Sequence, residues 1–279
     1  MTDSTITLSD PDEILQNLQV QIQDDFPALT DTSYTLKYVP EALESSLSPA
    51  FFLVPPIDSD GSNTIYINEK ASTEQNLYTM LAHEGYPGHL YQTVYYAKTD
   101  PPAIRTLLNF GGYTEGWATY CEMLSYYYAP LSKDEAVLMQ KNASLLLGLY
   151  ALADMGIHYN GWSVSDTITF FGSYGLTDAD SVKSIYQLII ADPANYLKYY
   201  IGYLEFLELK KKPSPTGVLT SLRKNFTRRY WNLALPHFHG LKNISYIPPA
   251  SNTLAASPAA VAIIAPASVY LVFVTFAVM

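Results

Sequence analysis

The sequence predicts a mainly α-helical protein with a small antiparallel β-sheet ahead of a helix that carries a His-Glu pair. Three observations predict this fold class. Hydrophobic residues make up 48% of the 279 residues, which is enough for a substantial core. Short β-rich segments occupy residues 34–39, 50–54 and 64–68, and clusters of Pro, Gly, Ser and Asp separate them. From Ile104 to about Tyr203 the pattern is mostly helical.

One helix is expected before the β-rich segments. Asp10 suits the capping position and Pro11 suits the first turn of a helix. Leu15, Leu18 and Ile22 then recur at helical spacing and form an apolar stripe. This stripe predicts a helix that packs one face against the rest of the protein.

A second helix is expected directly after the sheet. Residues 72–75 (Ser-Thr-Glu-Gln) form a capping-box pattern, and the helix that follows leads into His83-Glu84. A sheet followed by such a helix is the order found in many zinc peptidases, where an edge strand binds the substrate backbone. Residues 65–67 are the expected edge strand.

The later helices differ in their apolar character. Residues 137–157 are apolar on several faces, which predicts a buried helix. Gly116 and Ala118 are small and allow the helix that carries them to approach a neighbour closely.

The distribution of charge divides the chain into two parts. All 26 acidic residues fall at or before Glu208, whereas the 16 basic residues split evenly between the two sides. We therefore expect a catalytic lobe over residues 1–208 and a divergent acid-free tail over residues 209–279, which is disordered, frame-shifted or membrane-associated. The net charge of -10 argues against nucleic acid as a partner, because phosphate binding requires a basic surface.

The two ends of the chain bear on its location. Residues 1–12 are polar and acidic and lack the basic and apolar regions of a secretory signal peptide. Residues 259–279 contain no charged residue and are long enough to span a bilayer, so membrane contact through this tail is one alternative.

The strongest chemical signal is the run at residues 83–89 (His-Glu-Gly-Tyr-Pro-Gly-His). Zinc binds neutral imidazoles and carboxylates, and a glutamate beside the first histidine can take a proton from water. On an ideal helix, side chains six positions apart point about 120° away from each other. His83 and His89 can therefore share an ion only if the helix is distorted, and Pro87-Gly88 supplies a cause of distortion. Ordinary buried or surface histidines are the alternative.

A second segment supplies two glutamates on one helical face, Glu115 and Glu122. A downstream helical glutamate is a frequent third zinc ligand, which makes Glu115 the candidate. Glu122 could orient a ligand histidine through its second ring nitrogen. Solvated or capping glutamates are the alternative. Cys121 fits a small packed side chain better than a ligand.

Two further candidates lie later in the chain. Asp154 and His158 are one helical turn apart, so Asp154 could fix the tautomer of His158; a structural hydrogen-bonded pair is the alternative. Tyr199 belongs to a cluster of tyrosines, and a tyrosine hydroxyl could stabilise an oxyanion.

Together these motifs resemble the bacterial family catalogued as domain of unknown function 885. The resemblance covers roughly residues 9–208 and corresponds to the C-terminal half of the family members only. The matching pieces are residues 49–53 (Pro-Ala-Phe-Phe-Leu), residues 83–89 with Gln92, residues 115–118 (Glu-Gly-Trp-Ala) with Tyr120 and Glu122, Asp154 with His158 and Trp162, and Pro193, Tyr199, Ile201 and Gly202.

The resemblance implies a helical catalytic lobe similar to that of thimet oligopeptidase. It implies His83, His89 and Glu115 as ligands of Zn²⁺ and Glu84 as the catalytic base. It also gives Tyr199 and His158 a place near the reacting atoms. A bacterial protein is implied, with export possible in the full-length form.

The expected function is that of a zinc-dependent hydrolase, a metallopeptidase that cleaves peptide substrates with a zinc-activated water and Glu84 as general base. The rival interpretation is a non-catalytic metal-binding remnant that lacks the N-terminal half of the cleft. A third interpretation uses the same site on a non-peptide amide or ester.

Overall fold

Helices make up most of the part of the chain that the computed structural model describes, which comprises residues 6–56, 62–72, 74–102, 104–108 and 110–211. The predicted fold class, mainly α with a small sheet, is confirmed. The tail expected over residues 209–279 lies almost wholly outside the described residues. The helices and strands are α1 (Pro11–Gln21), β1 (Tyr34–Tyr38), β2 (Ala50–Leu53), β3 (Asn63–Ile67), α2 (Glu74–Glu84), α3 (His89–Ala97), α4 (Ile104–Leu107), α5 (Gly111–Ser125), α6 (Lys133–His158), α7 (Val164–Gly172), α8 (Ala179–Ala191) and α9 (Asn195–Lys211).

Helix α1 begins where the sequence predicts. The Asp10 side chain accepts hydrogen bonds from the backbone N–H groups of Asp12 and Glu13, and Pro11 occupies the first turn. Leu15 and Leu18, from the predicted apolar stripe, are fully buried against the sheet and α2. The start of α2 at Glu74 also agrees with prediction, although the side chains of its expected capping box lie largely outside the described residues.

The sheet is mixed, which corrects the expectation of a wholly antiparallel sheet. The strand order is β1-β3-β2, with β3 antiparallel to β2 but parallel to β1. A sequence pattern predicts strands without predicting their partners, and here the chain passes from β1 to the far side of β3 before it forms β2. Residues 65–67 therefore lie in the central strand, and the prediction that they form a substrate-binding edge was wrong. The free edges belong to β1 and β2.

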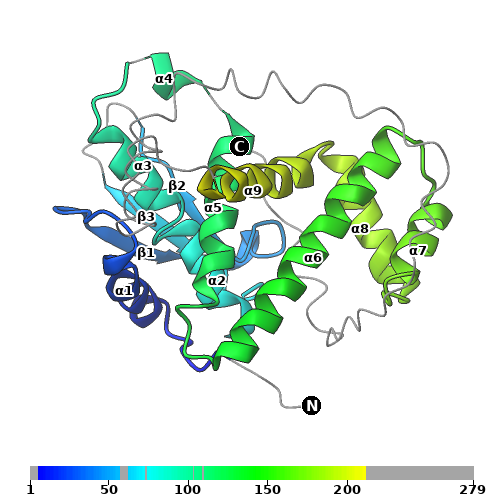
Figure 1. Ribbon diagram of the computed structural model, residues 1–279, viewed down its shortest axis with the longest axis horizontal. Coiled ribbons are helices and arrows are strands. Elements are labelled where there is room, and N and C mark those ends of the chain that lie inside the picture. Colours follow the sequence, from blue (N-terminus) through cyan, green and yellow to red (C-terminus); the bar gives the residue numbers. More distant parts are fainter. Residues whose placement is uncertain (1–5, 57–61, 73, 103, 109, 212–279) are drawn as a thin grey trace.

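Two groups of buried side chains form the core. The larger group joins α1, the sheet, α2, α3 and α5, and the smaller group joins the C-terminal half of α6 with α7 and α8. Figure 1 shows the sheet and α1 on one side of the molecule, α7 and α8 on the other, and the long α6 running between them. Helix α9 returns from α8 and crosses α5, so that α5 lies between α2 and α9.

Helix α6 is less buried than its sequence predicts. Tyr150, Ala153 and Asp154 are buried, whereas Leu138 is 68% exposed and Leu152 is 48% exposed. By length and composition α6 is the one described helix that could cross a membrane, with 39% of the relevant window buried. The core helices of soluble proteins meet the same criteria, and α6 packs against α7, α8 and α9.

Glycines make the crossing of α5 and α9 unusually close. A Cβ atom at Gly202 would lie 2.1 Å from the carbonyl oxygen of Gly112 and 2.7 Å from the Cα atom of Gly116. The predicted close approach at Gly116 is thus confirmed, with Gly202 as its partner. This contact holds α5 against α9 and thereby determines where the side chains of α5 lie relative to α2.

Replacing Gly202 with alanine is expected to destabilise the protein by about 1–3 kcal/mol, because the added methyl group forces α5 and α9 apart. Urea unfolding followed by circular dichroism measures the change. Gly172→Ala is the matched control, since a Cβ atom there meets nothing within 4 Å and alanine favours a helix. Equal stability of the two variants would contradict a tight crossing.

Candidate metal centre

A break between α2 and α3 brings the two histidines together. Helix α2 ends at Glu84, α3 begins at His89, and the Tyr86–Pro87 peptide bond between them is cis. The backbone N–H of Gly88 donates a hydrogen bond to the carbonyl oxygen of Ala82 at 2.9 Å. This bond spans more residues than the hydrogen bond of an α-helical turn, so the backbone is not helical here. The ring centroids of His83 and His89 lie 4.8 Å apart. The distortion that the spacing of the histidines requires is therefore present.

The break has specific supports. A Cβ atom at Gly88 would lie 1.7 Å from the carbonyl oxygen of His83, so only glycine fits there. The Pro87 carbonyl oxygen accepts hydrogen bonds from Trp117 Nε1 at 2.9 Å and from Cys121 Sγ at 3.4 Å. Cys121 is fully buried, as expected of a packed side chain. The support from Trp117 was not predicted, although its place beside Glu115 in the second motif was a signal.

Helix α5 adds Glu115 to the two histidines. Glu115 Oε2 lies 3.5 Å from His83 Nε2 and 3.3 Å from His89 Nε2. Ligand atoms of His83, Glu84 and His89 also lie within 4.8 Å of one another, close enough to hold a metal ion. The structure thus brings together four of the predicted site residues.

Glu122 lies on the outer side of His83. Its Oε2 atom is 3.0 Å from His83 Nδ1, and both side chains are buried. When Nδ1 carries the proton, it donates a hydrogen bond to this carboxylate. The unprotonated Nε2 atom then faces Glu115 and His89 and can bind a metal ion through its lone pair. Glu122 therefore fixes the tautomer and the ring orientation that a metal ligand needs.

The charges of the centre favour a bound cation. Burial lowers the pKa of His83, but the hydrogen bonds with Glu115 and Glu122 outweigh it and raise the pKa to about 10. Burial raises the pKa of Glu115, but the two histidines outweigh it and hold the pKa below its usual range. Positive charge between these groups is strongly stabilised, whether it comes from protons or from a metal ion. Two imidazoles and a carboxylate form a donor set that fits zinc.

Glu84 is anchored from the sheet. The backbone N–H of Phe52 donates to Glu84 Oε2 at 2.8 Å, and Glu84 is 3% exposed. Burial raises the pKa of Glu84, while the two histidines and the Phe52 N–H act in the opposite direction. The hydrogen bond from Phe52 was not predicted, because a backbone N–H makes it and its position depends on the direction in which the β2 edge faces.

Tyr199 approaches the centre from α9. Its ring stacks on that of His83, with the centroids 6.1 Å apart and an interplanar angle of 29°. Burial, together with the charges of Glu115 and Glu84, raises the pKa of Tyr199 well above its ordinary value. The phenol therefore stays protonated and can donate a hydrogen bond.

His158 pairs with Asp154 on α6. It is the last residue of α6. Its Nδ1 atom is 2.7 Å from Asp154 Oδ1, which also accepts a hydrogen bond from the backbone N–H of Ala194. The predicted pairing with Asp154 is present, but no contact of the described residues links His158 to the metal centre. Its catalytic role stays a prediction.

Solved structures share this fold. The chain resembles "the putative lipoprotein from Colwellia psychrerythraea" with a TM-score of 0.62 and 22% sequence identity, over 76% of this chain and 38% of that chain. It also resembles "a putative lipoprotein of unknown function from Shewanella oneidensis" with a TM-score of 0.55 and 18% identity, over 81% of this chain and 46% of that chain. The chain thus spans less than half the length of these structures.

Sequence comparison identifies the family. No curated protein matches the chain. A family model described as "Bacterial protein of unknown function (DUF885)" matches residues 4–224, which extends beyond the limits of the resemblance seen in the motifs. This match covers most of the chain and includes every residue of the metal centre, and the chain therefore belongs to the bacterial DUF885 family.

Proposed function

We propose that this chain carries the catalytic centre of a zinc-dependent hydrolase that cleaves peptide bonds. One observation carries the proposal: three helices bring two histidines and a glutamate together. The Nε2 atoms of His83 and His89 both lie within 3.5 Å of Glu115 Oε2, and Glu84 lies beside the histidines. His83 is buried and the other two side chains are only partly exposed. Such convergence of ionisable groups away from water is costly to build unless a ligand occupies it.

The roles follow from the positions of the side chains. His83, His89 and Glu115 would hold the ion, and three protein ligands leave room for a water or a substrate carbonyl. Bound zinc supplies Lewis acidity to both. Glu122 keeps His83 in the required tautomer.

Glu84 is the proposed general base. One of its oxygens is held by the Phe52 N–H, which fixes the carboxylate in place beside the histidines. A base needs a pKa close to the working pH, and burial moves the pKa of Glu84 upward in that direction. Glu84 would accept a proton from the attacking water and pass it to the leaving nitrogen of the cleaved peptide bond.

Tyr199 is the proposed oxyanion donor. Its hydroxyl remains protonated because burial and nearby carboxylates disfavour the phenolate. A buried phenol that stays neutral can donate a hydrogen bond to negative charge that develops on the carbonyl oxygen. The proposed role of His158 rests on the family resemblance alone.

A non-catalytic metal-binding module is the second candidate. It is favoured by the exposed apolar side chains of α6, including Leu138 and Leu152, which suggest a surface that is covered in a longer protein. In that case metal would bind without turnover. Both structural neighbours are described as putative lipoproteins, which supports export as part of this proposal.

Zinc binding tests the ligand set. The purified chain is expected to hold about one zinc ion after dialysis, measured by elemental mass spectrometry. His89→Ala should lose nearly all of it, because the remaining two ligands cannot close the site. His158→Ala is the matched control and should keep the zinc of the unmodified chain. Loss of zinc in the control alone would overturn the assignment.

Glu84→Gln tests the base. Zinc content should be unchanged, while hydrolysis of a quenched-fluorescence peptide library should fall by at least 100-fold, since an amide cannot accept the proton. Turnover near that of the unmodified chain would refute the role of Glu84. Zinc binding without turnover in the unmodified chain would favour the non-catalytic module.

Glu122→Gln tests the support of His83. The amide lacks the negative charge that favours the required tautomer, so zinc affinity should fall roughly 10- to 100-fold in a chelator competition assay. Glu135→Gln is the matched control, because Glu135 belongs to the N-terminal capping box of α6 and not to the metal centre. Equal affinities in both variants would show that Glu122 contributes nothing to metal binding.

A further inference from the structure

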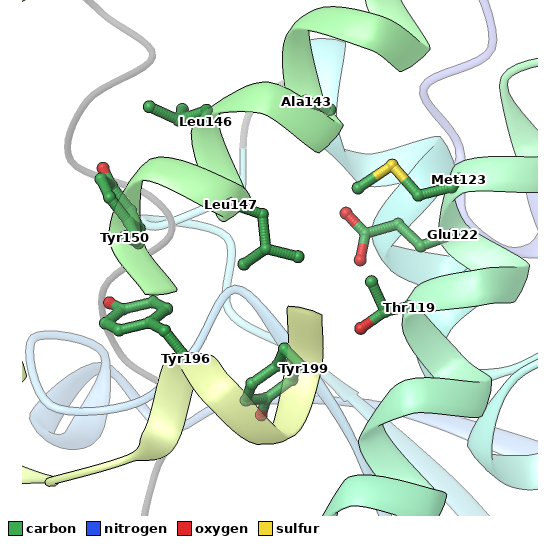
Figure 2. Close-up of a pocket in the computed structure, with 9 residues that line it drawn as sticks. All are labelled: Thr119, Glu122, Met123, Ala143, Leu146, Leu147, Tyr150, Tyr196 and Tyr199. Carbon is green, nitrogen blue, oxygen red and sulfur yellow. The ribbon is translucent and has the colours of Figure 1, made fainter. Parts of the chain in front are cut away.

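The metal centre is closed on one side and more open on the other. The His83 side chain is 2% exposed, whereas those of His89 and Glu115 are 15% and 21% exposed. On the closed side, Thr119 and Glu122 line a hollow of about 30 Å³, which has room for a water molecule but not for a substrate side chain. Figure 2 shows these two residues facing α6 across the hollow. A substrate therefore has to approach from the side of His89 and Glu115.

Lys198 lies at the rim of this open side. Its Cδ atom packs on Gly111, where an added Cβ atom would lie 3.2 Å away. Gly111 precedes Glu115 by one helical turn on the same face of α5. The Lys198 ammonium lies 6.0 Å from the centre of the Tyr199 ring, which lies 6.1 Å from the centre of the His83 ring. The sum of these two distances limits the separation of the ammonium from the His83 ring to about 12 Å.

The ammonium group of Lys198 is weakly held by its own chain. Its ion pair with Asp192 is long, at 3.9 Å between Nζ and Oδ2, and the two side chains are 37% and 35% exposed. An exposed ion pair of this kind is weak, because water and salt screen both charges. A carboxylate brought by a ligand can therefore replace Asp192 at little cost.

The charge of the centre gives this ammonium a function. Glu84, Glu115 and Glu122 together carry more negative charge than one zinc ion with neutral histidines balances. The lobe adds to this field, because residues 1–208 contain 26 acidic and eight basic residues. Such a field repels an anionic substrate. A free carboxylate can approach the ion only where a local positive charge offsets the field.

We propose that Lys198 binds the free α-carboxylate at the C-terminal end of a peptide substrate, so that cleavage occurs close to that end. This role of Lys198 rests on the proposed function. An extended peptide spans about 3.5 Å per residue, which puts a carboxylate at Lys198 no more than about four residues from the bond at the ion. An aspartate or glutamate side chain of the substrate offers the same chemistry, and the experiments below distinguish the two sources.

Probe binding tests the role of Lys198 without turnover. Acetyl-Ala-Ala-Ala with a free carboxylate is titrated into the full zinc-loaded chain and followed by ligand-observed NMR, with the C-terminal amide of the same peptide as the comparison. The Glu84→Gln background prevents cleavage during the titration. The free carboxylate should bind at least fivefold more tightly, and the difference should shrink when the salt concentration is raised from 0.05 to about 0.5 M. Equal binding of the two peptides would overturn the proposal.

Matched substitutions locate the charge. Lys198→Gln should abolish the preference for the free carboxylate, because the direct ligand of that group is lost. Lys183→Gln makes the same change on α8, where Lys183 pairs with Asp180, and should keep the preference. Circular dichroism checks the folding of both variants. A preference that persists in folded Lys198→Gln would refute the assignment, since the zinc ion alone would then account for it.

A third peptide identifies the source of the carboxylate. Acetyl-Ala-Ala-Asp with an amidated C-terminus carries its negative charge on a side chain and should bind no more tightly than the uncharged amide. Binding as tight as that of the free α-carboxylate would contradict recognition of the C-terminal end.

Turnover separates this role from the proposed function. Longer peptides with a free or an amidated C-terminus are given to the zinc-loaded chain, and the products are measured by mass spectrometry. The free carboxylate should lower KM at least fivefold, and Lys198→Gln should raise it to the value of the amide with kcat little changed. Lys198-dependent binding without cleavage would support the carboxylate site and contradict the peptidase. Cleavage of both peptides with equal KM would contradict the carboxylate site alone.

Discussion

The break between α2 and α3 is the constraint on which the candidate site depends. A continuous helix would point His83 and His89 in different directions, whereas the interruption at Pro87 and Gly88 sets their rings 4.8 Å apart. The break is held from α5, because Trp117 donates to the Pro87 carbonyl oxygen. The same helix carries Glu115, so the element that supports the break also supplies the third donor. The local backbone and the composition of the site are therefore coupled through α5.

The position of α5 depends in turn on α9. The close crossing at Gly116 and Gly202 brings Tyr199 on α9 over the His83 ring. Larger residues at the crossing would move Tyr199 and Glu115 away from the histidines together. Two glycines that carry no functional side chain thus control the geometry of the centre.

Much of this arrangement could be predicted from the sequence, and the misses share a cause. Glu115 and Glu122 were recognisable as neighbours because helical spacing converts directly into shared faces. The His-Glu run was recognisable from its residue types, and Pro87-Gly88 indicated that the helix breaks there. The parallel pairing of β1 with β3 was missed, and with it the central position of residues 65–67, since partner choice is a long-range property. The Phe52 N–H was also missed, because the β2 edge reaches Glu84 only through tertiary packing. Local periodicity contains none of this information.

The proposed metal donors and their supports all lie between β2 and α9. Substrate enclosure is a different matter, because α6 leaves the apolar side chains of Leu138 and Leu152 exposed. Metal affinity depends on converging donors and their hydrogen bonds, whereas turnover also requires walls that orient a peptide and exclude water. Metal affinity and turnover are therefore physically separable. Metal can bind tightly here while the rate of turnover depends on how well α5, α6 and α9 hold a substrate.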